Sequence, residues 1–553
     1  MDVRRGIILA SIAVLSYLLV LEWNEDYGKR PQVAQPITQL TPVINDQTDS
    51  PSMVQSANAD APSVSTDEPL VTLNAPATQL IEVKTDVLDI RINPQGGDIV
   101  YAALRAFPVS VEQKNTSFVL LEQSSVRNYV AQSGLVGKNG IDKDGRAQFS
   151  VEKTKFEMMD GDETLSVVLS IQKNGVAIDK VFNFKRGLYL VDIGYKVNNT
   201  TSESWQANFY AQFKRDRSTD PSSMESMGMN SYLGGAVTRP NENYFKIDFD
   251  DMDEGSFKEK VNGGWAAFLQ HYFLGAWVPA QEVDHTYSAR KAGGQYIVGY
   301  HDDALIVAPG TQGETFTSIY LGPKNQDRLA EIADHLALTI DYGWLWWVAQ
   351  PLFWLLQMMF GIAGNWGFAI ILLTILVKLA FFPLSAASYR SMANMRRVAP
   401  KLTALREQYG EDRQKLSQEM MGLYKKEKIN PLGGCLPILV QMPVFIALYW
   451  VLMESVELRQ APFMLWIEDL SIKDPFFILP LIMGASMFIQ MQLNPTPPDP
   501  MQAKVMKLMP IIFTVFFLFF PAGLVLYWVV NNVLSIAQQY YITKQIEKKA
   551  ADS

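Results

Sequence analysis

A single charged side chain lies deep inside an apolar stretch of this sequence. Lys378 falls about two-thirds of the way along residues 364–384, and Thr374, four residues earlier, shares its helix face. A charge inside a membrane span costs roughly 2.5–3.5 kcal/mol on insertion scales, so it usually faces a wet cavity or a partner. Because no acidic residue lies inside a span, we expect a cavity open to water. The alternative is that the lysine stem reaches the nearby membrane interface.

Further polar side chains in the apolar stretches are candidates for lining the same cavity. These residues are Gln441, Gln490, Asn531, Asn532, Ser535, Gln538 and Gln539, and Trp528 and Tyr527 are aromatic candidates. Taken singly, each polar residue is also explained by a hydrogen bond between helices. Trp528 and Tyr527 are also explained by packing or by a place at the membrane interface.

No catalytic motif accompanies these residues. The sequence has no P-loop, dinucleotide fingerprint, G-x-S-x-G or H-E-x-x-H pattern, and its four histidines are scattered. The single cysteine, Cys435, excludes an internal disulfide framework and a cysteine-based metal cluster. A net charge of −9 argues against non-specific binding of nucleic acid. We therefore predict that the protein is not an enzyme and uses no cofactor and no metal.

The apolar stretches predict six membrane spans, with a Trp-rich segment beside them. The predicted spans are residues 6–21, 364–385, about 432–453, 475–491, 505–520 and 523–542. The first belongs to an anchor at residues 1–23, because the small-x-small cleavage site of a signal peptide is missing. Residues 344–360 hold four tryptophans and could span the membrane, but we expect them to lie flat at the outer interface.

Loop charges predict the orientation in the membrane. Residues 386–430 carry ten Lys or Arg against five Asp or Glu, whereas residues 454–474 carry two against five. Positive loops stay inside, so residues 386–430 and both chain ends are predicted to be cytoplasmic. Apolar stripes on either side of Gly410 predict an antiparallel helical hairpin. Its basic residues suit docking to anionic lipid or to a ribosome-associated partner, or form a solvated face; they include Arg396, Arg397, Lys401, Arg413, Lys425 and Lys426.

The fold class predicted is a multi-span α-helical membrane protein with a large extracytoplasmic all-β sandwich domain. Residues 77–325 alternate apolar and polar positions between turn signals such as Asn174-Gly175, which is typical of antiparallel strands. A proline-rich linker at 24–76 is expected to be disordered. The other boundaries place connecting and interfacial helices at 326–361, a five-helix core at 362–543 and a tail at 544–553.

Three long stretches closely resemble YidC-type membrane protein insertases of the Gram-negative kind. They are residues 430–463, 474–490 and 499–533, within a likeness that is dense over 344–543. The resemblance implies an insertase and chaperone of the bacterial inner membrane with a periplasmic β domain. It would act on nascent membrane proteins, alone or with the Sec translocon, and would contact membrane lipids and the ribosome or signal recognition particle pathway. No other nucleic-acid contact is implied.

The resemblance also implies roles for particular residues. The core of the family encloses a hydrophilic groove, and Lys378 matches the position of a functional arginine in it. Thr374 matches a groove threonine, and Trp528 matches an aromatic residue that contacts substrate. Lysine keeps the charge of arginine but lacks its planar, bidentate fork, so the resemblance supports a need for positive charge at this position rather than for arginine.

Two other classes of function compete with this interpretation. A small-solute transporter would show internal repeats with broken spans at matching positions, and the sequence shows no such pairing. A scaffold or holdase would depend on its β domain for binding outer-surface partners. Deletion of residues 77–320 would distinguish a scaffold from an insertase, because the function of an insertase core should survive the deletion and that of a scaffold should not.

Overall fold

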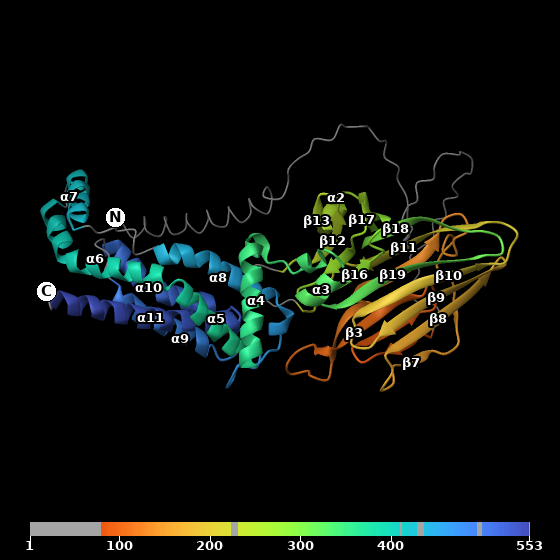
Figure 1. The fold of residues 1–553 in the computed structure, drawn as a ribbon, viewed down its shortest axis with the longest axis horizontal. Helices are drawn as coiled ribbons and strands as arrows, with labels where there is room; N and C mark the ends of the chain where they lie inside the picture. The colour runs from red at the N-terminus through yellow and green to blue at the C-terminus, as the bar shows by residue number, and fades with distance from the viewer. Residues whose placement is uncertain (1–78, 223–230, 410–411, 428–435, 495–499, 552–553) are drawn as a thin grey trace. The chain divides into compact units, whose positions relative to one another are not determined.

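The computed structural model describes residues 79–222, 231–409, 412–427, 436–494 and 500–551 (Figure 1). The predicted anchor at 1–23, the linker at 24–76 and the break at Gly410 lie outside these residues. The chain forms two compact units. One contains Met358–Phe445 and Lys473–Ser553, and the other contains the β domain together with Ile446–Ile472.

The predicted β-sandwich is confirmed as two large sheets. In order across the sheet, the ten-stranded sheet contains β14 (Phe257–Asn262), β17 (Asp284–Ala292), β18 (Gln295–Val307), β11 (Trp205–Arg215), β5 (Asn128–Val136), β4 (Ser117–Gln123), β3 (Asp98–Pro108), β2 (Leu88–Asn93), β1 (Ile81–Lys84) and β7 (Lys155–Glu157). The nine-stranded sheet contains β13 (Glu242–Ile247), β12 (Gly234–Arg239), β15 (Ala266–Leu269), β16 (Phe273–Val278), β19 (Gln312–Pro323), β10 (Leu190–Asn199), β9 (Val176–Lys185), β8 (Thr164–Lys173) and β6 (Ser150–Val151). All pairings are antiparallel except the one between β1 and β7.

Local sequence explains these strands. In β10, Val191, Ile193 and Val197 are buried while Lys196 between them is exposed, which is the period-two pattern of a strand covered on one face. Asn174-Gly175 joins β8 to β9 with Lys173 opposite Val176. Both turn residues have positive φ, as a two-residue type I′ hairpin requires.

The remaining elements are helices. Short ones accompany the β domain: α2 (Phe249–Glu254), α3 (Gln326–Ile332), η1 (Leu336–Thr339), η2 (Gly343–Leu345) and η4 (Val456–Leu458). The longer ones are α4 (Trp346–Ala363), α5 (Trp366–Ala380), α6 (Phe382–Tyr409), α7 (Arg413–Lys426), α8 (Leu436–Glu454), α9 (Ile478–Leu493), α10 (Pro500–Phe517) and α11 (Ala522–Ala551). Helix α11 packs against α5, α6 and α9, and α10 packs against α9.

The predicted span at 364–385 is divided in the structure. Helix α5 ends at Ala380, and α6 starts at Phe382 after a bend of 67°. Pro383 has no N–H to continue the hydrogen-bond ladder of α5, which accounts for the break. Helix α6 then runs unbroken to Tyr409, so the first helix of the predicted hairpin begins before residue 386.

Length and hydropathy identify fewer spans than the sequence patterns predict. Among the described residues, Gly343–Ala363 is the one helix long and apolar enough to cross a membrane, and the bent α5–α6 pair is a second candidate. Gln441–Glu454 and Ile478–Leu493 are shorter apolar helices. The six-span count and the flat placement of residues 344–360 therefore stay predictions.

Candidate functional site

Helix α11 supplies a row of polar side chains within the helical unit. Asn531, Ser535 and Gln539 are spaced by four residues, so they lie one above another on one face of the helix. Asn532 lies beside this row. Asn532, Ser535 and Gln539 are each less than 5% exposed, at 4%, 3% and 3%. A buried polar row of this kind requires partners on the neighbouring helices.

Lys378 of α5 meets this row at Ser535. Its side chain is 5% exposed, and Nζ donates to Ser535 Oγ at 2.7 Å. Ser535 Oγ in turn donates to the backbone oxygen of Asn531 at 2.7 Å. Thr374 is buried one turn before Lys378, and its Oγ1 donates to Ile370 O at 2.6 Å. The predicted shared face of Thr374 and Lys378 is thus present, and the lysine amine points at α11.

The charge of Lys378 has no acidic neighbour in the part of the chain that the structure describes. No described carboxylate lies within 4.0 Å of Nζ, whereas Nζ of the buried Lys324 lies 3.7 Å from Glu454. An ammonium group carries three N–H donors, and the hydroxyl of Ser535 accepts one of them. The site is therefore a buried cation that is solvated in part by a neutral group, and it favours water or an anion as a further partner.

Two other predicted groove residues make contacts between helices, and a third, Gln490, does not join them. Gln441 of α8 donates to Asn531 Oδ1, which joins it to the helix that carries Ser535. Asn532 Nδ2 donates to Ser486 Oγ of α9 at 3.0 Å. Gln490 is half-buried on α9, and no described residue connects it to the Lys378 network. Ser486 was not expected from sequence, because an isolated serine in an apolar helix gives no periodic signal.

Trp528 lies in an aromatic cluster rather than among the polar groups. Its ring is 4.6 Å from that of Phe445 in an edge-on arrangement, 5.2 Å from Phe517 and 6.4 Å from Phe513, measured between centroids. Such pairs stabilise helix packing. The aromatic cluster lies one turn before the polar row on the same side of α11, because Trp528 precedes Asn531 by three residues.

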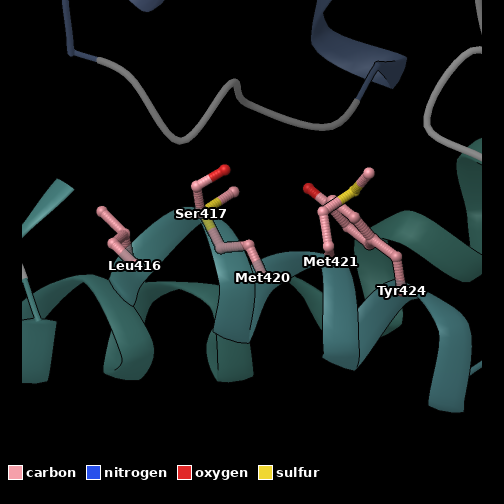
Figure 2. Close-up of a pocket in the computed structure, with 5 residues that line it drawn as sticks. All are labelled: Leu416, Ser417, Met420, Met421 and Tyr424. Carbon is pink, nitrogen blue, oxygen red and sulfur yellow. The ribbon is translucent and has the colours of Figure 1, made fainter. Parts of the chain in front are cut away.

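The helical hairpin predicted at 386–430 corresponds to α6 and α7, which pack against each other, and its cytoplasmic location stays a prediction. Its core consists of Val398 and Leu402, and four partly buried residues pack around them: Met395, Met420, Leu423 and Tyr424. A pocket of about 290 Å³ opens on α7, and Figure 2 shows its lining side chains on one side of the helix: Leu416, Ser417, Met420, Met421 and Tyr424.

The basic residues predicted for docking face outward where their side chains are described. Arg397, Lys401, Lys425 and Lys426 are exposed, while the side chains of Arg396 and Arg413 lie outside the described ones. Lys401 Nζ pairs with Glu427 at 2.7 Å, and this contact lowers the pKa of Glu427. Lys401 is thus already paired within the hairpin, whereas Lys425 and Lys426 extend to solvent.

Comparison with known proteins identifies the two parts of the chain. The family model for the YidC periplasmic domain matches residues 80–355, and that for the 60Kd inner membrane protein matches residues 358–549. These descriptions assign the β domain to the periplasm and the helical part to the bacterial inner membrane.

Curated relatives match over the full length. Two proteins named "Membrane protein insertase YidC", from Ectopseudomonas mendocina (strain ymp) and Stutzerimonas stutzeri (strain A1501), are each 55% identical to this chain. Each alignment covers all of this chain, and the two cover 99% and 100% of the respective relatives. The relative of that name from Pseudomonas fluorescens (strain SBW25) is 56% identical, and the alignment covers 100% of this chain and 99% of the relative. Insertion is not an enzymatic activity, in agreement with the missing catalytic motifs. The chain belongs to the YidC family of membrane protein insertases.

Proposed function

We propose that this protein inserts newly made proteins into the bacterial inner membrane and assists their folding, alone or beside the Sec translocon. In this proposal Lys378 lies in a hydrophilic groove that opens to the cytoplasm. The observation that carries it is the buried ammonium of Lys378, which is hydrogen-bonded to Ser535 and has no described carboxylate within 4.0 Å. A buried cation that no described carboxylate accompanies is suited to a transient anionic partner.

The physical task is to bring a polar segment of a substrate across hydrocarbon. An acidic residue entering the groove would meet the Lys378 ammonium, which offsets part of the cost of leaving water. Carboxylate oxygens can accept hydrogen bonds from the N–H groups of Lys378 that do not donate to Ser535. A membrane potential contributes roughly 2.3 kcal/mol per charge per 100 mV and would drive an acidic segment outward.

Short helices would lower the barrier further. Helix α5 has 15 residues and α9 has 16. At about 1.5 Å per residue they are about 22–24 Å long, which is less than the ~30 Å hydrocarbon core. Short spans thin the bilayer around them. The apolar flank of the substrate would pass into the lipid along the aromatic cluster at Trp528 of α11, whose ring contacts Phe445 and Phe517.

The cytoplasmic hairpin is the proposed docking surface for the delivery stage. Lys425 and Lys426 at the end of α7 are exposed, as a contact with anionic lipid or with ribosome-associated partners requires. The same helix carries the apolar pocket around Met420 and Met421. Flexible methionine side chains adapt to varied apolar segments.

Reconstituted insertion tests this function. The full-length protein in proteoliposomes is supplied with a small single-span substrate whose translocated tail carries two acidic residues, and with a matched substrate whose tail is neutral. Lys378→Ala should reduce insertion of the acidic substrate roughly tenfold and affect the neutral one less, while Lys378→Arg should retain activity. If Lys378→Ala and Lys378→Glu both insert the acidic substrate at the wild-type rate, the electrostatic part of the proposal is wrong.

A further inference from the structure

Residues 446–472 belong to the β-domain unit although they lie in the middle of the membrane part of the sequence. The inner-membrane family model runs through them, from 358 to 549. In the structure, however, Ile446–Ile472 packs with the β domain. We call residues 446–472 the clasp. It contains the last turns of α8 and the loop that leads toward α9, so the division between the two units falls within one continuous helix.

The first contact caps the end of α8. His271, in the turn between β15 and β16, places Nε2 2.8 Å from the backbone oxygen of Met453. Carbonyl groups in the last turn of a helix have no partner within the helix, so His271 satisfies one of them. Burial lowers the pKa of His271, so its ring is neutral at physiological pH and donates from Nε2. The backbone N–H of His271 donates to Asp220 Oδ2 at 2.6 Å, which holds the turn.

The second contact is a buried ion pair at the same helix end. Lys324 Nζ lies 3.7 Å from Glu454 Oε2, and the two side chains are 1% and 3% exposed. Ser231 Oγ donates to the other oxygen of Glu454 at 2.7 Å. Cations are also favoured near a helix C-terminus, where the helix dipole is negative. Loss of one partner would leave the other charged and buried, which is strongly destabilising.

The third contact holds the loop after α8. Arg459 Nη2 donates to Pro108 O at 2.7 Å and Val109 O at 2.9 Å at the end of β3. Its guanidinium lies 5.4 Å from the ring centroid of Phe273, a cation–π distance. Asn325 Nδ2 donates to Glu457 Oε1 at 2.9 Å. The β domain thus binds the clasp at its helix end and along its loop.

We propose that the β domain braces α8, so that its grip on the clasp positions the membrane-embedded half of that helix. Helix α8 contains Pro443, whose missing N–H leaves the carbonyl of residue 439 without its helical partner and weakens the turn that carries Gln441. A helix weakened in this way depends more on fixation of its ends. Gln441 is the α8 residue that contacts Asn531 of α11, so the brace maintains a contact made by a groove residue.

Hydrogen exchange on the full-length protein in nanodiscs tests the brace without relying on insertion activity. Amide exchange is compared between the wild type and the variants His271→Ala, Glu454→Gln and Arg459→Ala. Lys260→Ala is the matched control, because it removes a lysine from an exposed ion pair with Asp303 on the same domain. Insertion of the acidic substrate is measured in parallel as a separate readout.

The brace predicts that the three variants speed exchange about tenfold or more in residues 446–471 and several-fold in 436–445, a size in line with loss of a buried polar contact. Strands β9 and β10 and the control variant should exchange as in the wild type. Unchanged exchange in 446–471 would overturn the proposal. Two other results would also overturn it: faster exchange in 446–471 with no change in 436–445, or faster exchange throughout the β domain.

Discussion

Lys180 in the β domain and Lys378 in the helical unit are both buried, at 0% and 5% exposure, but their surroundings differ. Lys180 Nζ donates to Gly96 O at 3.0 Å and Ser133 O at 3.1 Å. It belongs to a network in which Arg146 binds Asp98 and lies 3.2 Å from Asp142. Lys378 donates to the hydroxyl of Ser535.

The difference separates a structural charge from an available one. In the β domain, Arg146 pairs with Asp98 and Asp142, and two backbone oxygens accept hydrogen bonds from Lys180, so the charged groups of this network have partners within the fold. Around Lys378 the fold provides a hydroxyl in place of a carboxylate. A group without a counter-ion among the described residues can bind one that arrives with a substrate, which is why we propose a function for Lys378 and not for Lys180.

The largest effect on stability is expected in the β-domain network. Arg146→Met would leave Asp98 and Asp142 buried without their strongest partner, and should lower the free energy of unfolding of the β domain by about 3–5 kcal/mol. Thermal unfolding of the full-length protein, followed by circular dichroism of the β domain, measures this loss. Lys260→Met, at an exposed pair, should leave Tm unchanged. Equal shifts in Tm for both variants would remove the contrast between buried and exposed charges.

Lys378→Met should have the opposite effects, with little change in stability and a loss of insertion activity. It removes a desolvated cation, and Ser535 keeps its hydrogen bond to Asn531 O, so stability should change by less than about 1 kcal/mol or rise. Insertion of the acidic substrate should fall, as for Lys378→Ala. A loss of stability as large as that of Arg146→Met would show that Lys378 is a structural charge and would remove the distinction drawn above.

The neutral contact between Asn532 and Ser486 should contribute less. Double-mutant cycles of hydrogen bonds between membrane helices average about 0.6 kcal/mol. Asn532→Ala, Ser486→Ala and the double variant, unfolded in mixed micelles, should therefore give a coupling near that value. A coupling above about 2 kcal/mol would show that this contact is much stronger than an ordinary hydrogen bond between membrane helices and would contradict the expected contrast with the β-domain network.

The last predicted effect is a pH dependence confined to the clasp. Burial raises the pKa of Glu457 to about 7, above its unfolded value near 4.5, so the folded state binds the extra proton between these values. Stability of the clasp should therefore fall as pH rises from about 5 through 7. Hydrogen exchange of residues 446–471 at pH 5.5 and 7.5, corrected for intrinsic rates, measures this change, and Glu457→Gln should abolish it. A persistent dependence in that variant would assign the effect to another group.

Local patterns in the sequence predict the parts of this molecule that depend on neighbours along the chain. The alternation in β10 and the turn at Asn174-Gly175 are examples, and both are present. The solitary charge at Lys378 is also visible in the sequence, whereas the break between α5 and α6 is missed, because the apolar pattern predicts one span at 364–385 despite Pro383. The features that are predicted follow from periodicity, backbone restriction and charge burial, each of which is readable within a few residues.

Contacts between distant parts of the chain are not readable in this way. The partner of Lys378 lies 157 residues away at Ser535, and the contacts of the clasp join His271 to Met453 and Arg459 to Pro108 across 182 and 351 residues. Nothing in the local pattern of residues 446–472 distinguishes a loop packed on a β domain from a free one. Tertiary packing decides these contacts.

Access of water to Lys378 tests the central claim most directly. In a Cys435→Ser background, Lys378→Cys is treated from the cytoplasmic face with a charged, membrane-impermeant thiol reagent, and Leu373→Cys, at a fully buried apolar position of the same helix, is the control. A hydrophilic groove predicts modification at position 378 and none at 373. If position 378 stays unmodified while an exposed cysteine such as that of Lys425→Cys reacts, the groove at Lys378 is dry and the account is contradicted.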